Sequence, residues 1–203
     1  LEWDELMDFY NCDFTKRPGL ANVRDVFCFC AFTGLRYSDA AKLRCSDIHD
    51  TYISIVTQKT SDGLRVELNA FSRAILERNR QFQQDHRHNP DGLALPVISN
   101  QKMNSYLKDA GRLAGITAPV RIVYFRGSER YDNEYQKWEL LTTHCARRTF
   151  VVNALRLGIP SEVIMKWTGH SGFNSMKPYV KIVDELKEKE MSKFDTLYQD
   201  GSP

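Results

Sequence analysis

An imidazole and a phenol stand close together near the end of the chain, in the stretch WTGHSGFNSMKPYV. His170 directly follows a glycine, and Tyr179 comes nine residues later. An imidazole exchanges protons near neutral pH, and a phenol becomes a nucleophile once its proton is removed. The pair alone is weak evidence, because Gly-His dipeptides are common and a tyrosine near a helix start usually packs in a core. Any chemistry for these two groups therefore needs residues from elsewhere.

Three earlier stretches supply cationic and proton-transferring groups. Arg36 follows a Gly-Leu pair in TGLRYSDAAKL, and Lys59 lies in TQKTSDG, near a predicted hairpin turn. His144 and Arg147 stand three residues apart in THCARRTF, so on a helix both side chains share one face. Taken separately, each stretch has an ordinary explanation as a surface or solvated residue. Taken together, they provide the cationic donors that suit a phosphate group.

The six residues, in this order, resemble the catalytic domain of the tyrosine recombinases, also called the phage-integrase family. The resemblance extends over nearly the whole chain. It rests on a first arginine, a hairpin lysine, an HxxR box, a Gly-His pair and a tyrosine: Arg36, Lys59, His144, Arg147, His170 and Tyr179. No single element is specific, but the ordered set is.

The chain departs from the family pattern at four places. Arg148 stands where a histidine often follows the box arginine, and WTGH replaces the commoner Leu-Gly-His. Pro178 directly precedes the tyrosine and is expected to hold Lys177 in extended geometry, which would help to aim the phenol. A predicted hairpin between Val120 and Leu141 is long for the family. We interpret it as an elaboration near the DNA or a partner subunit.

The resemblance implies a reaction on DNA. In the family, the tyrosine attacks a phosphodiester, forms a 3′-phosphotyrosine link and releases a 5′-hydroxyl. A 5′-hydroxyl from a partner duplex then reverses the step. Because the covalent link retains the bond energy, ATP is not required. We therefore predict a site-specific recombinase or integrase whose nucleophile is Tyr179 and which needs no metal and no other cofactor.

The resemblance also implies a role for each remaining residue. Arg36 and Arg147 would clamp the phosphate and stabilise the charge that develops on its non-bridging oxygens. His144 would accept the proton of the phenol, and His170 would donate a hydrogen bond to a non-bridging oxygen. Lys59 would protonate the departing 5′-oxygen as a general acid.

Three alternatives stay open on the sequence alone. Type IB topoisomerases use a similar set of residues to relax one duplex, although the compact size and the spacing favour a recombinase. A non-catalytic DNA-binding relative is the second alternative, and an unrelated helical regulator is the third. As partners we predict double-stranded DNA and a tetramer on two DNA sites, with the isolated domain a monomer. The long hairpin and the unusual box residues favour a mobile-element integrase over a resolvase of chromosome dimers.

Composition and charge are compatible with this reading. The 203 residues carry a net charge of +2, but residues 101–181 hold 13 Lys and Arg against 6 Asp and Glu. Such a segment suits phosphate binding, although a solvated basic face explains it equally well. The five irregularly spaced cysteines indicate free thiols and a reducing compartment, the cytoplasm. We expect neither a membrane span nor a leader peptide.

Periodicity predicts an α+β fold, a mainly helical catalytic domain with a small antiparallel β-sheet. Six segments share helical spacing: 1–13, 18–34, 70–86, 100–115, 143–158 and 160–169. A short helix over 36–43 is expected to use Ser38 as its N-cap, and its Asp39 is expected to support the site. Alternating β-branched residues over 49–69 predict two or three short strands with a turn at 61–63.

We treat residues 1–203 as one catalytic domain. Because the chain lacks a starting methionine, we expect a fragment without the N-terminal core-binding domain of the family. Residues 182–198 are predicted to form an amphipathic tail helix. Its apolar edge comprises Ile182, Val183, Leu186, Met191 and Phe194. In the resembled family such a tail often docks on a neighbouring protomer, and docking on its own domain is the alternative.

Overall fold

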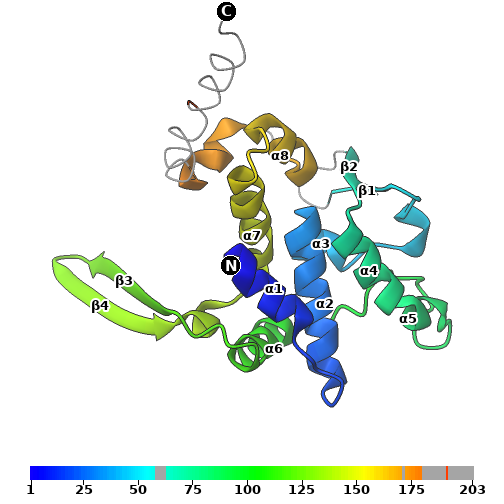
Figure 1. Cartoon of the computed structure of the whole chain (residues 1–203), viewed down its shortest axis with the longest axis horizontal. Helices are drawn as coiled ribbons and strands as arrows, with labels where there is room; N and C mark the ends of the chain where they lie inside the picture. Colours follow the sequence, from blue (N-terminus) through cyan, green and yellow to red (C-terminus); the bar gives the residue numbers. More distant parts are fainter. Residues whose placement is uncertain (58–62, 171, 180–190, 192–203) are drawn as a thin grey trace, which may run out of the picture.

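The computed structural model describes residues 1–57, 63–170, 172–179 and 191. These residues form a helical body with two separate two-stranded antiparallel sheets, one beside the body and one projecting from it (Figure 1). The mainly helical α+β prediction is confirmed, with two small sheets in place of one. Apart from Met191, the predicted tail helix at 182–198 lies outside the described residues.

The elements follow the chain in this order. The helices are α1 (Trp3–Asn11), α2 (Pro18–Thr33), α3 (Tyr37–Ala40), α4 (Ala70–Arg78), α5 (Arg80–Gln84), α6 (Asn100–Leu113), α7 (Thr143–Arg156) and α8 (Ser161–Thr168). The strands are β1 (Tyr52–Val56), β2 (Gly63–Glu67), β3 (Pro119–Arg126) and β4 (Glu129–Gln136). Short 3₁₀ helices are η1 (Cys45–Asp47), η2 (Lys137–Leu140) and η3 (Phe173–Tyr179).

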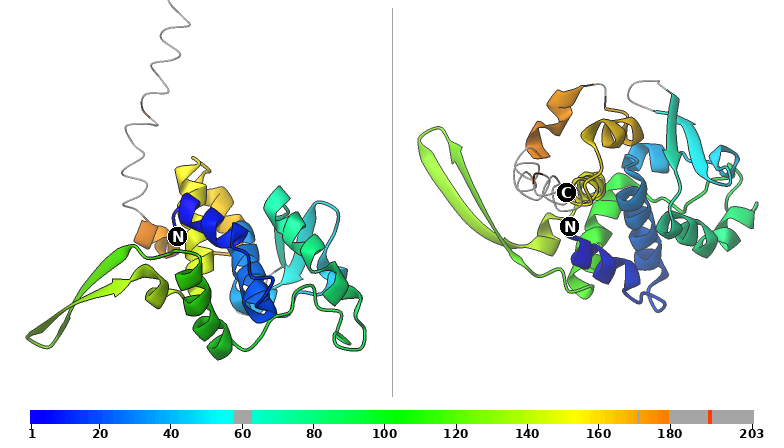
Figure 2. Two further views of the ribbon diagram at one scale, coloured as in Figure 1. Left: turned by 60° about the horizontal axis from the view of Figure 1, so that its bottom comes forward. Right: turned by 45° about the horizontal axis from the view of Figure 1, so that its top comes forward.

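The central helix of the body is α2. Its sequence is apolar on nearly every side, and a helix of that kind has to be enclosed by other elements. The helices α1, α3, α4, α6 and α7 pack around it (Figures 1 and 2). As predicted, α2 begins at Pro18 and ends at Gly34, which adopts left-handed backbone geometry as the C-cap. The core thus fixes the position of Arg36, two residues beyond this end.

The cysteines agree with the expectation of free thiols. All five are unpaired, and Cys28 and Cys30 are buried in α2. Burial raises the pKa of the Cys30 thiol to about 12, so this group stays protonated and behaves as an apolar core residue. No helix in the described part of the chain has both the length and the apolar character that a bilayer crossing requires.

One predicted helix is interrupted. Residues 70–86 form α4 and α5, which are separated at Asn79. The buried Asn79 amide donates to the Ile75 carbonyl at 2.9 Å and to the Asp25 carboxylate at 3.0 Å. Asp25 also pairs with Arg78 at 3.4 Å. A buried carboxylate has to be paired, and the side chain that helps to pair it competes with the helical backbone at this point.

The predicted N-cap of α3 is wrong. The helix begins directly after Arg36, which occupies the cap position with extended backbone and makes no side-chain capping bond. Ser38 therefore lies inside the helix. The Arg36 carbonyl accepts hydrogen bonds from the backbone N–H groups of Asp39 and Ala40, each at 3.0 Å. These first intrahelical hydrogen bonds place the start of the helix at Arg36 and not at Ser38.

The prediction that Lys177 has extended backbone before Pro178 is wrong. Both residues lie inside η3. The residues flanking this pair are buried, since Met176 is 3% and Tyr179 8% exposed. They pack in a second apolar cluster with residues of α7 and α8: Val151, Ala154, Leu155 and Ile164. This packing outweighs the preference of a pre-proline residue for extended backbone.

The first hairpin matches its prediction. Strands β1 and β2 pair in antiparallel register, with Ile53 opposite Val66, and both side chains are buried. Strand β2 packs on α8. Lys59 and most of the predicted turn fall in residues 58–62, which lie outside the described residues.

The second hairpin extends away from the body (Figures 1 and 2). Strands β3 and β4 pair along their full length, and Gly127 adopts a left-handed φ of +61° at the turn. The pairing ends at Gln136, and η2 replaces the last part of the hairpin predicted to reach Leu141. Its interpretation as an elaboration near DNA or a partner stays a prediction.

Substituting Gly34 is expected to destabilise the fold. Its φ is +73°, and an added Cβ would lie 2.7 Å from the Phe150 ring, which closes α7 against the end of α2. Gly34→Ala should lower the free energy of unfolding by about 2–4 kcal/mol, from backbone strain and overpacking combined. Urea denaturation monitored by circular dichroism measures this loss.

Gly92→Ala is the matched control, because Gly92 has a φ of +63° but nothing within 4 Å of an added Cβ. Its free energy of unfolding should fall only by the cost of the backbone strain, about 1–2 kcal/mol. Equal losses in the two variants would show that the contact between Gly34 and Phe150 does not matter.

Candidate active site

Arg147 is the buried centre of the site. It lies in the second turn of α7 and is 5% exposed. Its Nη1 donates to the Gly34 carbonyl at 2.8 Å, and its Nη2 donates to the Thr168 carbonyl. These acceptors stand at the C-terminal ends of α2 and α8, where helix carbonyls lack intrahelical partners and carry partial negative charge. The guanidinium of Arg147 thus links its own helix, α7, to the C-terminal ends of α2 and α8.

His170 continues this network. Its Nε2 lies 3.0 Å from Arg147 Nη2, and because a guanidinium only donates, Nε2 accepts and the proton of the neutral ring is assigned to Nδ1. Nδ1 lies 2.9 Å from Thr168 Oγ1, which donates in turn to the Ile164 carbonyl at 2.7 Å. To donate to a phosphate oxygen through Nε2, the ring has to release Arg147 and place a proton on that nitrogen.

Arg36 brings a second guanidinium to the end of α2. Its Nη1 lies 3.7 Å from Oδ2 of Asp39, whose carboxylate is almost fully buried. This is an ion-pair distance but too long for a hydrogen bond. Among the residues that the structure describes, the buried Nη1 has no hydrogen-bond acceptor. The buried Asp39 carboxylate is thus the ion-pair partner of Arg36, and its role in supporting the site stays a prediction.

The two guanidiniums act on each other. Burial, and then the charge of Arg36, lower the pKa of Arg147 to about 10, while the charges of Asp39 and Tyr179 act in the opposite direction. Arg147 still carries its full charge at neutral pH. Two like charges in a partly desolvated site repel each other, and a bound anion relieves that repulsion. The electrostatics therefore favour an anionic ligand.

The phenol of Tyr179 reaches this region from η3. Burial raises its pKa, whereas the charges of Arg148 and Arg147 lower it. Burial prevails, so the phenol is protonated at neutral pH. It needs a base before it can act as a nucleophile.

His144 lies in the first turn of α7 and is exposed. Although the residue is exposed overall, partial desolvation of its imidazole, and then the charges of Arg148 and Arg147, lower the imidazole pKa below the ordinary value. The ring is therefore neutral at neutral pH, which is the form that accepts a proton. The same helix thus carries both a cation for an anionic ligand and a candidate base.

The structure gathers most of the residues singled out in the sequence. Contacts or mutual charge effects connect Arg36, His144, Arg147, His170 and Tyr179. Lys59 lies outside the described residues.

Sequence reasoning missed one member of this group. In the sequence Arg148 is only a departure from the family pattern, but in the structure its charge lowers the pKa of both the Tyr179 phenol and the His144 imidazole. The signal was present in the sequence: Arg148 follows His144 by four residues and so shares its helix face.

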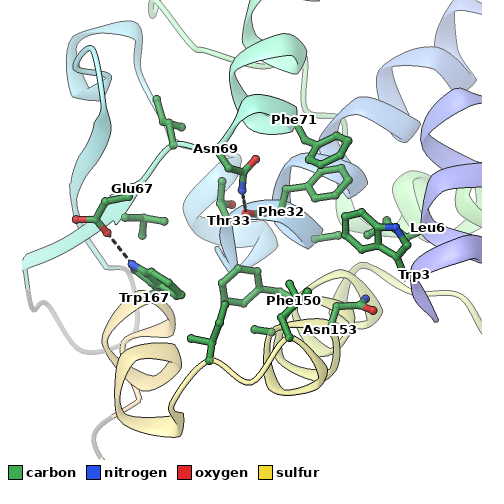
Figure 3. A pocket seen from close by; sticks show the side chains of 16 residues that line it. Trp3, Leu6, Phe32, Thr33, Glu67, Asn69, Phe71, Phe150, Asn153 and Trp167 are labelled. Atoms are coloured by element: carbon green, nitrogen blue, oxygen red, sulfur yellow. Dashed lines mark hydrogen bonds between the residues drawn. The ribbon is translucent and has the colours of Figure 1, made fainter. Parts of the chain in front are cut away.

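Trp167, the other unusual residue of WTGH, links α8 to the first hairpin. Its Nε1 donates to Oε2 of Glu67 at 2.6 Å (Figure 3). Glu67 ends β2, the strand that follows the segment with Lys59. The bond therefore ties the hairpin to the helix that leads into His170.

An apolar pocket of about 360 Å³ lies beside this link, between α1, α2, α4, α7 and α8 (Figure 3). Its aromatic lining comprises Trp3, Phe32, Phe71, Phe150 and Trp167. None of the residues singled out for catalysis lines it. The pocket is thus separate from the cationic site.

Comparisons with known proteins place this geometry in context. A family model described as "Phage integrase family" matches residues 2–185. A search of curated proteins found no match.

Three solved structures illustrate the likeness in fold. The XerA recombinase superimposes with a TM-score of 0.67 and 16% identity, over 94% of this chain and 64% of that one. The XerH recombinase in a post-cleavage complex with its difH substrate gives 0.64 and 15%, over 98% and 53%. The lambda integrase catalytic core gives 0.55 and 17%, over 84% and 90%. The chain thus spans between about half and two thirds of the two recombinases.

Proposed function

The chain belongs to the phage integrase family, and we propose that residues 1–203 are the catalytic domain of a site-specific DNA recombinase or integrase that breaks and rejoins strands through Tyr179. The observation that carries this proposal is the convergence of two guanidiniums, from Arg36 and Arg147, with the Tyr179 phenol. Paired guanidiniums beside a nucleophile suit an in-line attack on a phosphodiester.

The arginines hold the scissile phosphate in this account. Arg36, paired with Asp39 through its Nη1, and Arg147 donate to the two non-bridging oxygens from different sides. Both donors are fixed by the fold before substrate arrives, so little reorganisation is needed as charge builds on the oxygens. His170 joins them once its Nε2 carries a proton and has left Arg147.

The proton and bond changes balance as follows. The Tyr179 oxygen forms a bond to phosphorus as the bond to the 5′-oxygen breaks. The phenol proton passes to the neutral His144, and Lys59 protonates the departing 5′-oxygen. The products are a 3′-phosphotyrosine link and a 5′-hydroxyl, and rejoining is the reverse. The transfer conserves the phosphoester bond, so we propose that neither ATP nor a metal takes part.

Double-stranded DNA is the proposed partner. A similar structure is described as a lambda integrase tetramer bound to a Holliday junction, at 15% identity and a TM-score of 0.56. By analogy we propose that the parent protein acts as a tetramer on two DNA sites, with the isolated domain a monomer. The free thiols suggest that it acts in the cytoplasm, and the projecting β3–β4 hairpin supports an integrase of a mobile element.

Tyr179→Phe is expected to abolish a covalent protein–DNA adduct. The full-length parent would be incubated with a nicked suicide substrate of its site, which traps the adduct for a denaturing gel. The wild type should give an adduct that survives EDTA, and Arg36→Gln should form it at least about 100-fold more slowly. Tyr106→Phe, on the exposed surface of α6, is the matched control and should react normally. An adduct that persists in Tyr179→Phe would refute Tyr179 as the nucleophile.

The tail over 182–198 is proposed to dock on a neighbouring protomer, with the aromatic-lined pocket as a surface that can bury its apolar edge. Removing residues 184–203 should then leave a parent protein that binds its site but no longer forms the tetrameric complex, as measured by native gels and light scattering. Unchanged assembly and cleavage after truncation would contradict this proposal.

A further inference from the structure

We propose that Glu67 and Trp167 are positioning residues for the protonation of the departing 5′-oxygen. Their hydrogen bond fixes the first hairpin, to which Lys59 belongs, on the helix that leads into His170. This inference deepens the proposed function and rests on it for the role of Lys59 as general acid. The contact between the hairpin and α8 does not depend on that role.

The hydrogen bond joins an indole to a carboxylate. Trp167 Nε1 donates to Oε2 of Glu67 at 2.6 Å (Figure 3). An indole N–H can only donate and a carboxylate can only accept, so the direction of the bond is fixed. Because the acceptor is charged, the bond is stronger than one between neutral groups. The indole is held from the other side by Phe150, whose ring meets it edge to face with the centroids 6.0 Å apart.

The outer face of the hairpin orients the Glu67 carboxylate. Arg65 Nε lies 3.3 Å from Oε1 of Glu67, the oxygen that Trp167 does not use. The Arg65 guanidinium in turn lies over the Tyr52 ring, 3.9 Å from its centroid. Arg65 and Glu67 are two residues apart on β2, and Tyr52 is opposite Glu67 on β1, so the three side chains share one face of the sheet. Glu67 is therefore held in place by its own hairpin as well as by α8.

A second contact fixes the other end of β2. A Cβ added at Gly169 would lie 3.7 Å from Cδ1 of Leu64 and 3.9 Å from Cγ2 of Thr57, so the hairpin is within van der Waals reach of this residue. Leu64 is buried and stands three residues before Glu67, roughly 10 Å away along an extended strand. Two contacts that far apart fix the direction of the strand as well as its position. Thr57 precedes Lys59 by only two residues in the chain.

The end of α8 that holds the hairpin also carries groups of the phosphate site. Thr168, the residue after Trp167, accepts from Arg147 through its carbonyl, and its hydroxyl lies 2.9 Å from Nδ1 of His170. Hairpin and phosphate site thus share one anchor. The contacts of Arg147 and His170 do not pass through Glu67. Loss of the Trp167–Glu67 bond is therefore expected to move the hairpin relative to the phosphate site and to leave that site assembled.

Proton transfer is the step that such a movement affects. A general acid has to come within hydrogen-bond reach of the oxygen that it protonates, about 3 Å. A displacement of about 1 Å in a reacting group can slow a reaction by up to about 100-fold. The charge on the non-bridging oxygens is stabilised by Arg36 and Arg147, which belong to other elements. The defect is therefore expected in the departure of the 5′-oxygen and not in phosphate binding.

Amide hydrogen exchange in this chain tests the position of the hairpin. Trp167→Phe keeps an aromatic ring against Phe150 and removes the indole donor. It should speed exchange of the β1 and β2 amides about fivefold or more and leave the α2 amides unchanged. Trp138→Phe is the matched control, because it makes the same change in η2, which packs on α6. Hairpin exchange that is the same in Trp167→Phe and the wild type would overturn the inference.

The closing test asks whether the bond acts through the leaving group. The full-length parent would cleave two suicide substrates, one with the natural 5′-oxygen at the scissile bond and one with 5′-sulfur in its place. A thiolate leaves without a proton, because the pKa of a thiol, about 8.5, lies far below that of an alcohol. With oxygen, Trp167→Phe and Glu67→Leu should form the adduct about tenfold more slowly. Glu67→Gln retains an acceptor and should stay within about threefold of the wild type.

With the sulfur substrate, all of these variants should match the wild type within about twofold. Lys59→Ala should show the same dependence on the leaving group, and adding Trp167→Phe to it should slow the oxygen reaction no further. If Trp167→Phe is not slowed, or is slowed equally with both substrates, the inference is overturned and the proposed function stands. No wild-type adduct with either substrate would refute the proposed function and the catalytic role together, whereas faster hairpin exchange in Trp167→Phe would still establish the structural contact.

Discussion

A guanidinium taken out of water must be surrounded by oxygen acceptors, and the position of Arg147 follows from that requirement. A buried cation without partners would be too costly to keep. The fold supplies the carbonyls of Gly34 and Thr168, at the negative ends of α2 and α8. Three helices therefore converge on one side chain. Because Arg36 follows the first of these ends and His170 the second, the same constraint places both of them beside Arg147.

Local packing then adds the remaining groups to this centre. Gly34 has no side chain, so Phe150 can close α7 against α2. The second apolar cluster seats η3 on α7 and α8 and carries Tyr179 to the cationic end of α7. The site that results combines mutually repelling guanidiniums, a neutral imidazole and a protonated phenol. The repulsion between the guanidiniums is unfavourable without an anion, and a bound anion would relieve it.

The sequence predicted what depends on local pattern. Pro18 marks the start of α2 and Gly34 its end, and the HxxR spacing placed His144 and Arg147 on one helix. It did not predict the acceptors of Arg147, because backbone carbonyls at helix ends leave no signature of residue type. Nor did it predict the break at Asn79, which arises from a buried carboxylate far away in the chain. The conformation of Lys177 was missed because tertiary burial of its neighbours overrode a local proline rule.

The central claim is that Arg147 organises the fold as well as the chemistry, whereas Arg36 serves the ligand. Comparing Arg147→Lys with Arg36→Lys in urea denaturation tests it most directly. A single ammonium cannot reproduce the planar fork that reaches both helix ends. We predict that Arg147→Lys loses about 2–4 kcal/mol of unfolding free energy, while Arg36→Lys loses less than about 1 kcal/mol. A stability for Arg147→Lys equal to that of the wild type, or equal losses in the two variants, would contradict the account.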